Sequence, residues 1–213
     1  MNSPTRFLLL DINGLLCCKV PKGQKYKNYD KSDILKLNSY KVIIRPYCRE
    51  FLEKCYSQFT IGFFTSTCEW NVKAILNKLL TPEQHKATVL MWFRDRTRFD
   101  PDTSHEVSGF DTIKVLDDIF QNPMVNEKRL YSEQNTVLID DSETKTRFND
   151  PANIIICKAF TGEENDQGLL DLLEIIPQKF EALTEFRLGP FDNYGPTKYS
   201  SKSITSSKKI TKF

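Results

Sequence analysis

The chain has 213 residues and a formal net charge of +2, with 39% hydrophobic and 27% charged residues. This composition is typical of a globular protein with one sizeable core, and the nearly balanced charge argues against nucleic acid as a direct partner. Six cysteines show neither CxxC pairs nor a dense framework, so we interpret them as reduced thiols rather than zinc ligands or disulfides. They are Cys17, Cys18, Cys48, Cys55, Cys68 and Cys157.

The first apolar run, FLLL at residues 7–10, ends at Asp11 after only four residues. It is too short for the apolar region of a signal peptide or for a membrane span. We therefore expect a protein of the cytoplasm or the nucleus with no membrane span. Four consecutive apolar residues without alternation are typical of an inner strand of a parallel sheet.

Apolar stretches that end in polar residues recur along the chain and predict strands. They are FLLL before Asp11, VII before Arg45, FTIGFF before Thr65, TVLI before Asp140 and NIIIC before Lys158. Helix-like segments lie between them at residues 46–58, 69–80 and 111–120. The alternation predicts an α/β fold with a doubly wound, Rossmann-like parallel sheet. A last helix over residues 168–183 contains Pro177 and is predicted to kink or break there.

Two segments depart from this alternation. Residues 19–40 are rich in Lys and Tyr and predict an exposed flap, and the irregular, charged residues 90–108 predict a small insertion beside the site. We expect residues 1–186 to form one domain and residues 187–213 to be a basic, Ser- and Lys-rich tail without a packed structure.

Several residues have ordinary structural interpretations. Trp70 and Trp92 are predicted to pack in the core or under the flap. The adjacent Cys17 and Cys18 are predicted to be small buried side chains rather than a redox pair. His85 and His105 have no partner pattern around them and are predicted to be surface residues.

Polar side chains follow three of the predicted strands: Asp11 with Asn13, then Thr65, then Asp140 with Asp141. In open α/β sheets, ligands bind beyond the carboxyl ends of the strands. Adjacent carboxylates at such a position repel each other, so a bound cation or a buried lysine is their natural partner.

Taken singly, each of these residues also has a simpler reading. Asp11 and Asn13 could only shape a turn, and Thr65 could cap the following helix. Lys114 could be a solvated charge on an amphipathic segment.

The order Asp, then Thr or Ser, then Lys, then an acidic pair resembles the haloacid dehalogenase (HAD) superfamily of phosphoryl transferases. Five segments resemble the phosphatases that act on the C-terminal domain of RNA polymerase II, the FCP and small C-terminal-domain type, over roughly residues 5–185. They are IIRPYCREFLEKC, FFTSTCEW, MWFRDRTRF, FDTIKVLDDI and VLIDDSETKTRFNDPANIIICKAF. The resemblance implies a HAD-type sheet with a flap and an insertion near the site, and a Mg²⁺-dependent phosphatase acting on phosphoproteins or phosphopeptides.

The resemblance also implies a role for individual residues. Asp11 would attack phosphorus and form an aspartyl-phosphate. Asp141 stands where these phosphatases commonly have Asn, and Asp140 would orient the metal shell or Lys114. Catalytic roles fall on Asp11, Asn13 and Lys114, substrate phosphate binding on Thr65, Ser66, Arg94 and Lys114, and Mg²⁺ binding on Asp11, the backbone carbonyl of Asn13, Asp140 and Asp141.

Asn13 departs from the family pattern, which has an Asp two residues after the nucleophile. That Asp protonates the leaving group and then activates water, and an amide cannot transfer a proton. Two hypotheses follow. The chain is a Ser/Thr phosphatase of altered or reduced activity, or it is a pseudo-phosphatase that uses the same pocket for binding, like the family's mitochondrial import relative.

Overall fold

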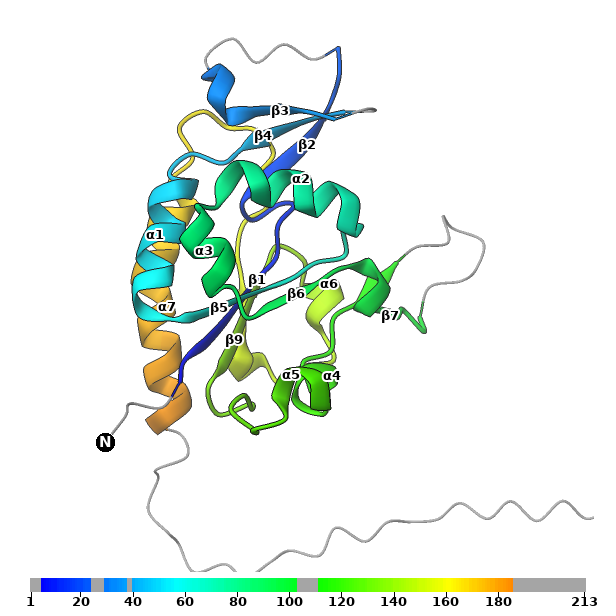
Figure 1. Ribbon diagram of the computed structural model, residues 1–213, viewed down its shortest axis with the longest axis vertical. Helices are drawn as coiled ribbons and strands as arrows, with labels where there is room; N and C mark the ends of the chain where they lie inside the picture. Colours follow the sequence, from blue (N-terminus) through cyan, green and yellow to red (C-terminus); the bar gives the residue numbers. More distant parts are fainter. Residues whose placement is uncertain (1–4, 24–28, 38–39, 103–110, 186–213) are drawn as a thin grey trace, which may run out of the picture.

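The computed structural model describes residues 5–23, 29–37, 40–102 and 111–185 (Figure 1). The predicted tail over residues 187–213 and the surface assignment of His105 lie outside the described residues. Within them, no helix combines the length and apolar character that crossing a membrane requires.

A five-stranded parallel sheet forms the centre of the protein, with strand order β10-β9-β1-β5-β6. Its inner strand β1 pairs with β5 on one side and β9 on the other, and all four of its residues are buried. The predicted α/β fold with a parallel sheet is thus confirmed. The strands are β1 (Phe7–Leu10), β5 (Thr60–Phe64), β6 (Leu90–Trp92), β9 (Thr136–Asp140) and β10 (Ile154–Ile156).

Helices cover both faces of this sheet (Figure 1). On one face, Leu8 and Leu10 pack against α1, α2 and α7, and on the other, Phe7 and Leu9 pack against the segment that holds α4. Alternate residues of β1 therefore contribute to two separate cores. The helices are α1 (Cys48–Gln58), α2 (Glu69–Leu79), α3 (Pro82–Ala87), α4 (Asp117–Phe120), α5 (Pro123–Asn126), α6 (Glu143–Thr146) and α7 (Gly168–Glu185), with a 3₁₀ turn η3 (Pro151–Asn153) before β10.

The predicted flap is a separate three-stranded antiparallel sheet, which we call the flap sheet. It consists of β2 (Cys17–Pro21), β4 (Tyr40–Ile44) and β3 (Ile34–Lys36), in that order, with a 3₁₀ turn η1 (Lys31–Asp33) before β3. The stretch VII before Arg45 is therefore a strand, but its assignment to the parallel sheet was wrong. Strand β2, which lies earlier in the chain, pairs with this strand in the antiparallel direction. It occupies the edge of β4 with which a parallel neighbour would have to form hydrogen bonds.

The segment over residues 90–108 was predicted to be irregular, and this was wrong for its first three residues. Leu90 and Trp92 are buried and form the fifth strand, which is too short to show a periodic pattern. The described remainder is a 3₁₀ turn, η2 (Arg94–Arg96), and a short antiparallel ribbon of β7 (Arg98–Phe99) with β8 (Thr112–Ile113).

Three further predictions were wrong. The helix expected over residues 111–120 is reduced to the short helix α4. The first part of this segment forms strand β8, which pairs with β7, and Lys114 lies in the loop between β8 and α4. Of the kink or break predicted at Pro177, the break is wrong: helix α7 continues through this residue, since packing against α1 outweighs one lost backbone hydrogen bond. Trp70 is 75% exposed, whereas Trp92 is buried as predicted.

Candidate active site

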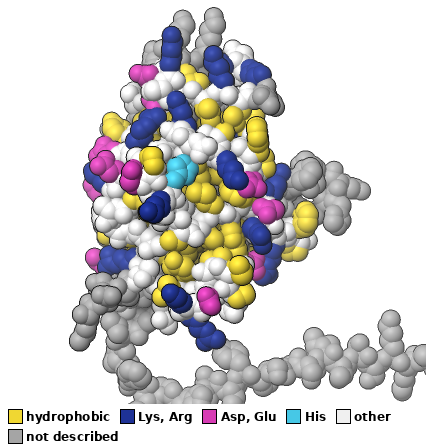
Figure 2. Space-filling view, viewed as in Figure 1, with side chains coloured by type: hydrophobic (Ala, Val, Ile, Leu, Met, Phe, Trp, Pro, Cys, Tyr) yellow, Lys and Arg dark blue, Asp and Glu magenta, His cyan; other side chains and the backbone are white. Residues whose placement is uncertain are grey.

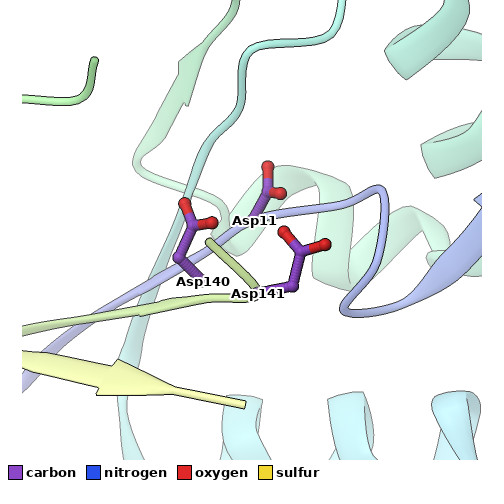
Figure 3. A group of neighbouring side chains, drawn as sticks. All are labelled: Asp11, Asp140 and Asp141. Carbon is purple, nitrogen blue, oxygen red and sulfur yellow. The ribbon is translucent and has the colours of Figure 1, made fainter. Parts of the chain in front are cut away.

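Three carboxylates meet at the carboxyl edge of the parallel sheet (Figure 3). Asp11 follows β1 and Asp140 ends β9, and these strands run in register, with Leu10 opposite Ile139. The backbone N–H of Asp11 donates to the carbonyl of Ile139 over 3.0 Å, which fixes Asp11 beside the end of β9. One oxygen of each carboxylate, from Asp11, Asp140 and Asp141, lies within 4.8 Å of the others. We call these three residues the acidic cluster.

Lys114 is fully buried beside the acidic cluster. Its Nζ lies 2.9 Å from Asp11 Oδ1 and 2.5 Å from Asp140 Oδ2. The loop that carries it is held by backbone contacts, because the Lys114 N–H donates to the carbonyl of Lys145 and the Asn149 side chain donates to the carbonyl of Lys114. This lysine is therefore a fixed part of the site and not a solvated surface charge.

The ionisation of the cluster reflects its burial. Burial raises the pKa of Asp140 to about 6, although Lys114 acts in the opposite direction. Burial and the charge of Asp11 also raise the pKa of Asp141. For Lys114, burial lowers the pKa, but the attraction of Asp11 and Asp140 outweighs it and the pKa is raised. Lys114 therefore stays charged, while Asp140 and Asp141 resist ionisation.

The site leaves oxygen atoms unsatisfied. Within the described residues, Asp11 Oδ1, Asp141 Oδ1 and Asn13 Oδ1 are buried and have no hydrogen-bond partner, although Asp11 Oδ1 has its ion pair with Lys114. Oxygen atoms, especially those of carboxylates, are the ligands that Mg²⁺ prefers. A single lysine cannot balance three carboxylates, so a divalent cation would supply the missing charge. The residues present therefore fit a magnesium ion.

The loop after β1 passes close to Asp141. Gly14 has a positive φ of 91°, and a Cβ at this position would lie 1.9 Å from Asp141 Oδ2. Only glycine satisfies both conditions. Asn13 precedes it, and because Asn13 Oδ1 accepts no hydrogen bond, this side chain does not shape the turn by an Asx contact.

The predicted phosphate-binding residues lie on neighbouring loops. Thr65 follows β5 and is buried, and its Oγ1 accepts a hydrogen bond from the Thr67 N–H over 3.3 Å. Cys68, not Thr65, occupies the N-cap of α2, so the capping alternative for Thr65 is wrong. Ser66 Oγ lies 3.1 Å from Thr112 Oγ1, which ties this loop to β8. The Arg94 N–H donates to the Thr67 carbonyl, so the loops after β5 and β6 are joined.

Sequence reasoning missed Arg45, which is 2% exposed. Its Nε and Nη2 form a bidentate ion pair with Asp166, at 2.6 and 3.1 Å. Its Nη1 donates to the carbonyl of Leu15 in the loop after β1, and Nη2 donates to that of Lys158. Arg45 therefore links the active-site loop to the segment before α7. The available signal was a charged residue directly after a buried apolar strand.

A parallel α/β sheet with buried carboxylates and a lysine at its carboxyl edge agrees with the predicted resemblance to the HAD phosphoryl transferases. A family model agrees with this class: the NLI interacting factor-like phosphatase family matches residues 6–187. The chain belongs to this family. The predicted resemblance to FCP-type phosphatases is thereby confirmed.

Individual relatives are distant. An uncharacterized FCP1 homology domain-containing protein of Schizosaccharomyces pombe is 27% identical over 164 residues, which cover 75% of this chain and 63% of the relative. Fission yeast Fcp1, an RNA polymerase II CTD phosphatase solved with beryllium fluoride, is similar in structure with a TM-score of 0.53 and 15% identity, over 86% of this chain and 53% of that one.

A second Fcp1 structure gives a TM-score of 0.53 and 18% identity, over 91% of this chain and 56% of that one. These structural matches support the fold. The chain spans less than two thirds of the length of the curated relative and of both Fcp1 chains.

Proposed function

We propose that this protein is a Mg²⁺-dependent phosphatase of phosphoproteins that works through an aspartyl-phosphate on Asp11. The observation that carries the proposal is the acidic cluster with its buried lysine and its unsatisfied oxygens. A site that served only stability would match its buried charges and hydrogen bonds. Membership of a phosphatase family supports the same assignment.

In the proposed reaction, a carboxylate oxygen of Asp11 attacks the phosphorus of a phosphoserine or phosphothreonine. A bond forms between an Asp11 oxygen and phosphorus while the bond from phosphorus to the Ser or Thr oxygen breaks, and that oxygen takes a proton from water, because Asn13 cannot supply one. Water then attacks the phosphorus of the aspartyl-phosphate, which releases phosphate and restores the Asp11 carboxylate. The chemistry depends on position and on neutralised charge.

Each neighbour has a task in this scheme. Lys114 neutralises charge on Asp11 and on the phosphoryl group, and Asp140 holds its ammonium in place. Thr65 and Ser66 donate hydrogen bonds to phosphate oxygens, and Arg94 adds positive charge. Asp11, the backbone carbonyl of Asn13 and Asp141 would hold Mg²⁺. The ion supplies charge neutralisation for the phosphate when it is bound.

The site lacks a group at position 13 that can transfer a proton. Asn13 cannot protonate a leaving group or activate water, and loss of a positioned acid or base lowers a rate by about 10² to 10⁴-fold. We therefore infer low activity on phosphoserine and phosphothreonine and higher activity on aryl phosphates, whose leaving groups need little help from an acid.

The test is Mg²⁺-dependent hydrolysis of para-nitrophenyl phosphate by the wild type, Asp11→Asn and Asn13→Asp under the same conditions. We expect slow turnover by the wild type, none by Asp11→Asn, and a gain in Asn13→Asp. The aryl leaving group needs little help from an acid, so the gain comes from the restored base that activates water against the aspartyl-phosphate. Glu143→Gln, an exposed residue of α6 close in sequence to the acidic cluster, serves as the control and should match the wild type.

Asn13 also favours a second candidate function, that of a pseudo-phosphatase that binds a phosphorylated partner without turnover. No turnover in the wild type, and none gained in Asn13→Asp, would overturn the enzyme proposal. Calorimetric binding of Mg²⁺ and a phosphopeptide by that inactive protein would then establish the binding function.

A further inference from the structure

The flap sheet presents two different faces. Its register places Lys19 opposite Val42, and Cys17 opposite Ile44, on one face. Cys17, Val42 and Ile44 on this face pack into the main core beneath the sheet. The opposite face, with Cys18, Val20 and Ile43, packs against Phe160. Lys19 therefore projects from the face that is turned toward the body of the protein. Among the residues that β2, β3 and β4 place on this face, Lys19 is the charged one.

Lys19 lies near the mouth of the candidate active site. It lies in β2, and this strand is joined to the active-site loop because the Gly14 N–H donates to the carbonyl of Cys17 over 2.7 Å. Lys19 itself is exposed. Its Nζ lies 5.4 Å from the ring centroid of Tyr40 on the same face. Burial lowers the pKa of Lys19, and the charge of Arg94 from η2 lowers it further, while the Asp11 carboxylate raises it. The flap sheet thus brings a further cation to the site, and Figure 2 shows Lys and Arg side chains gathered over the part of the surface where the flap sheet and α2 lie.

Tyr40 supplies a second, independent observation. Its hydroxyl is buried, and it has no hydrogen-bond partner within the described residues. Burial raises the pKa of Tyr40, so this hydroxyl keeps its proton and is available to donate. A buried hydroxyl without a partner is unfavourable, and an acceptor brought by a ligand would remove the penalty. The Lys19 ammonium near the ring of this tyrosine adds a positive charge, which suits an anionic acceptor.

We propose that Lys19 and Tyr40, beside Arg94, form a second anion subsite that binds another negatively charged group of the substrate, next to the phosphate that is removed. The inference rests on the proposed function and deepens it. The substrate class becomes a phosphopeptide with a carboxylate or a second phosphate close to the phosphorylated residue. Lys19 and Tyr40 are then specificity-determining residues that do not touch the reacting atoms.

The test compares three phosphopeptides of one sequence that differ only beside the phosphoserine: alanine, glutamate or a second phosphoserine. We expect the wild type to prefer both charged peptides to the alanine peptide by about 10-fold or more in kcat/KM, mainly through a lower KM. The glutamate and phosphoserine peptides together show whether a carboxylate suffices or a phosphate is required.

Lys19→Met and Tyr40→Phe should each reduce this preference, with Lys19→Met bringing the ratio of kcat/KM close to one. Lys36→Met is the matched control, because Lys36 lies in β3 on the opposite face of the same flap sheet. It should leave the preference as in the wild type. A global loss of folding would lower kcat/KM for all three peptides and would not change their ratio.

A wild type without preference, or a preference that survives Lys19→Met, would overturn the inference. If neither the wild type nor Asn13→Asp turns over any of the peptides, the proposed function fails, and the subsite is then tested by binding. The dissociation constants of fluorescent forms of the peptides, measured by anisotropy for wild type and Lys19→Met, must show the same preference and its loss. Equal affinities would overturn the inference in that case as well.

Discussion

The pair of Arg45 with Asp166 and the acidic cluster with Lys114 are both groups of buried charges, and they differ in how well their charges are matched. Arg45 and Asp166 form a pair of equal and opposite charges. Backbone carbonyls accept further hydrogen bonds from the Arg45 guanidinium. The acidic cluster has three carboxylates against Lys114, and it has oxygens without a hydrogen-bond partner.

The difference separates a structural role from a functional one. Burial of charge is unfavourable in both places, but only the Arg45 pair is complete within the chain. The negative charge of the acidic cluster is balanced only when a cation from outside the chain binds to it. Unmatched acceptors are therefore a better guide to a site than burial or the number of charges.

The largest expected effect comes from breaking the complete pair. Arg45→Met leaves Asp166 buried without its cation, so we expect the free energy of unfolding to fall by about 3–5 kcal/mol. Urea denaturation measures this. Arg49→Met is the control, since Arg49 pairs with Asp33 at the surface and its loss should change stability by at most about 1 kcal/mol. Equal effects of the two variants would show that the buried pair has no special weight.

The acidic cluster should have an unusual pH dependence. In the folded chain the pKa of Asp140 is about 6, above its value of about 3.9 in an unfolded chain. The folded state therefore binds this proton more tightly, and without metal the free energy of unfolding should fall, by about 1–3 kcal/mol, as the pH rises from about 4 to about 6. The raised pKa of Asp141 acts in the same direction.

Urea denaturation in the presence of a chelator between pH 4 and pH 7 measures this slope. Asp140→Asn should flatten it, because the variant lacks the titrating group. Lys114 does not contribute in this window, since its raised pKa lies far above it. The same slope in the wild type and in Asp140→Asn would contradict the unfavourable ionisation of Asp140.

The smallest expected effect comes from a substitution that brings the charges of the acidic cluster closer to balance, as they are in the Arg45 pair. Asp141→Asn removes one repelling carboxylate, so we expect the metal-free protein to gain about 1 kcal/mol in stability. Mg²⁺ should raise the melting temperature of the wild type more than that of the variant, because binding to the folded state stabilises it by mass action. An equal rise in both proteins, measured by calorimetry, would show that the charge of Asp141 does not contribute to Mg²⁺ binding.

The sequence predicted the parts of this picture that depend on local pattern and chain order. The apolar runs before Asp11, Thr65 and Asp140 marked three inner strands of the sheet, and the resemblance pointed to Lys114. Because the carboxyl ends of parallel strands share one edge, strand order was enough to bring Asp11 and Asp140 together.

The rest depended on information that no short segment contains. The stretch VII before Arg45 has the same apolar character in a parallel or an antiparallel sheet, and only its pairing with β2 places it in the flap sheet. Strand β6 was too short to show a period. Arg45 is buried because Asp166 and two distant carbonyls meet it, and a sequence does not show such a convergence.

The central position of β1 has a consequence for the timing of synthesis. The strand that carries Asp11 emerges early, but its partners β5 and β9 end at residues 64 and 140. Ribosomes add about 5–20 residues per second, so β1 waits several seconds for both neighbours. Until then its four apolar residues have no sheet to enter, and a nascent chain stalled before residue 136 is expected to need a chaperone.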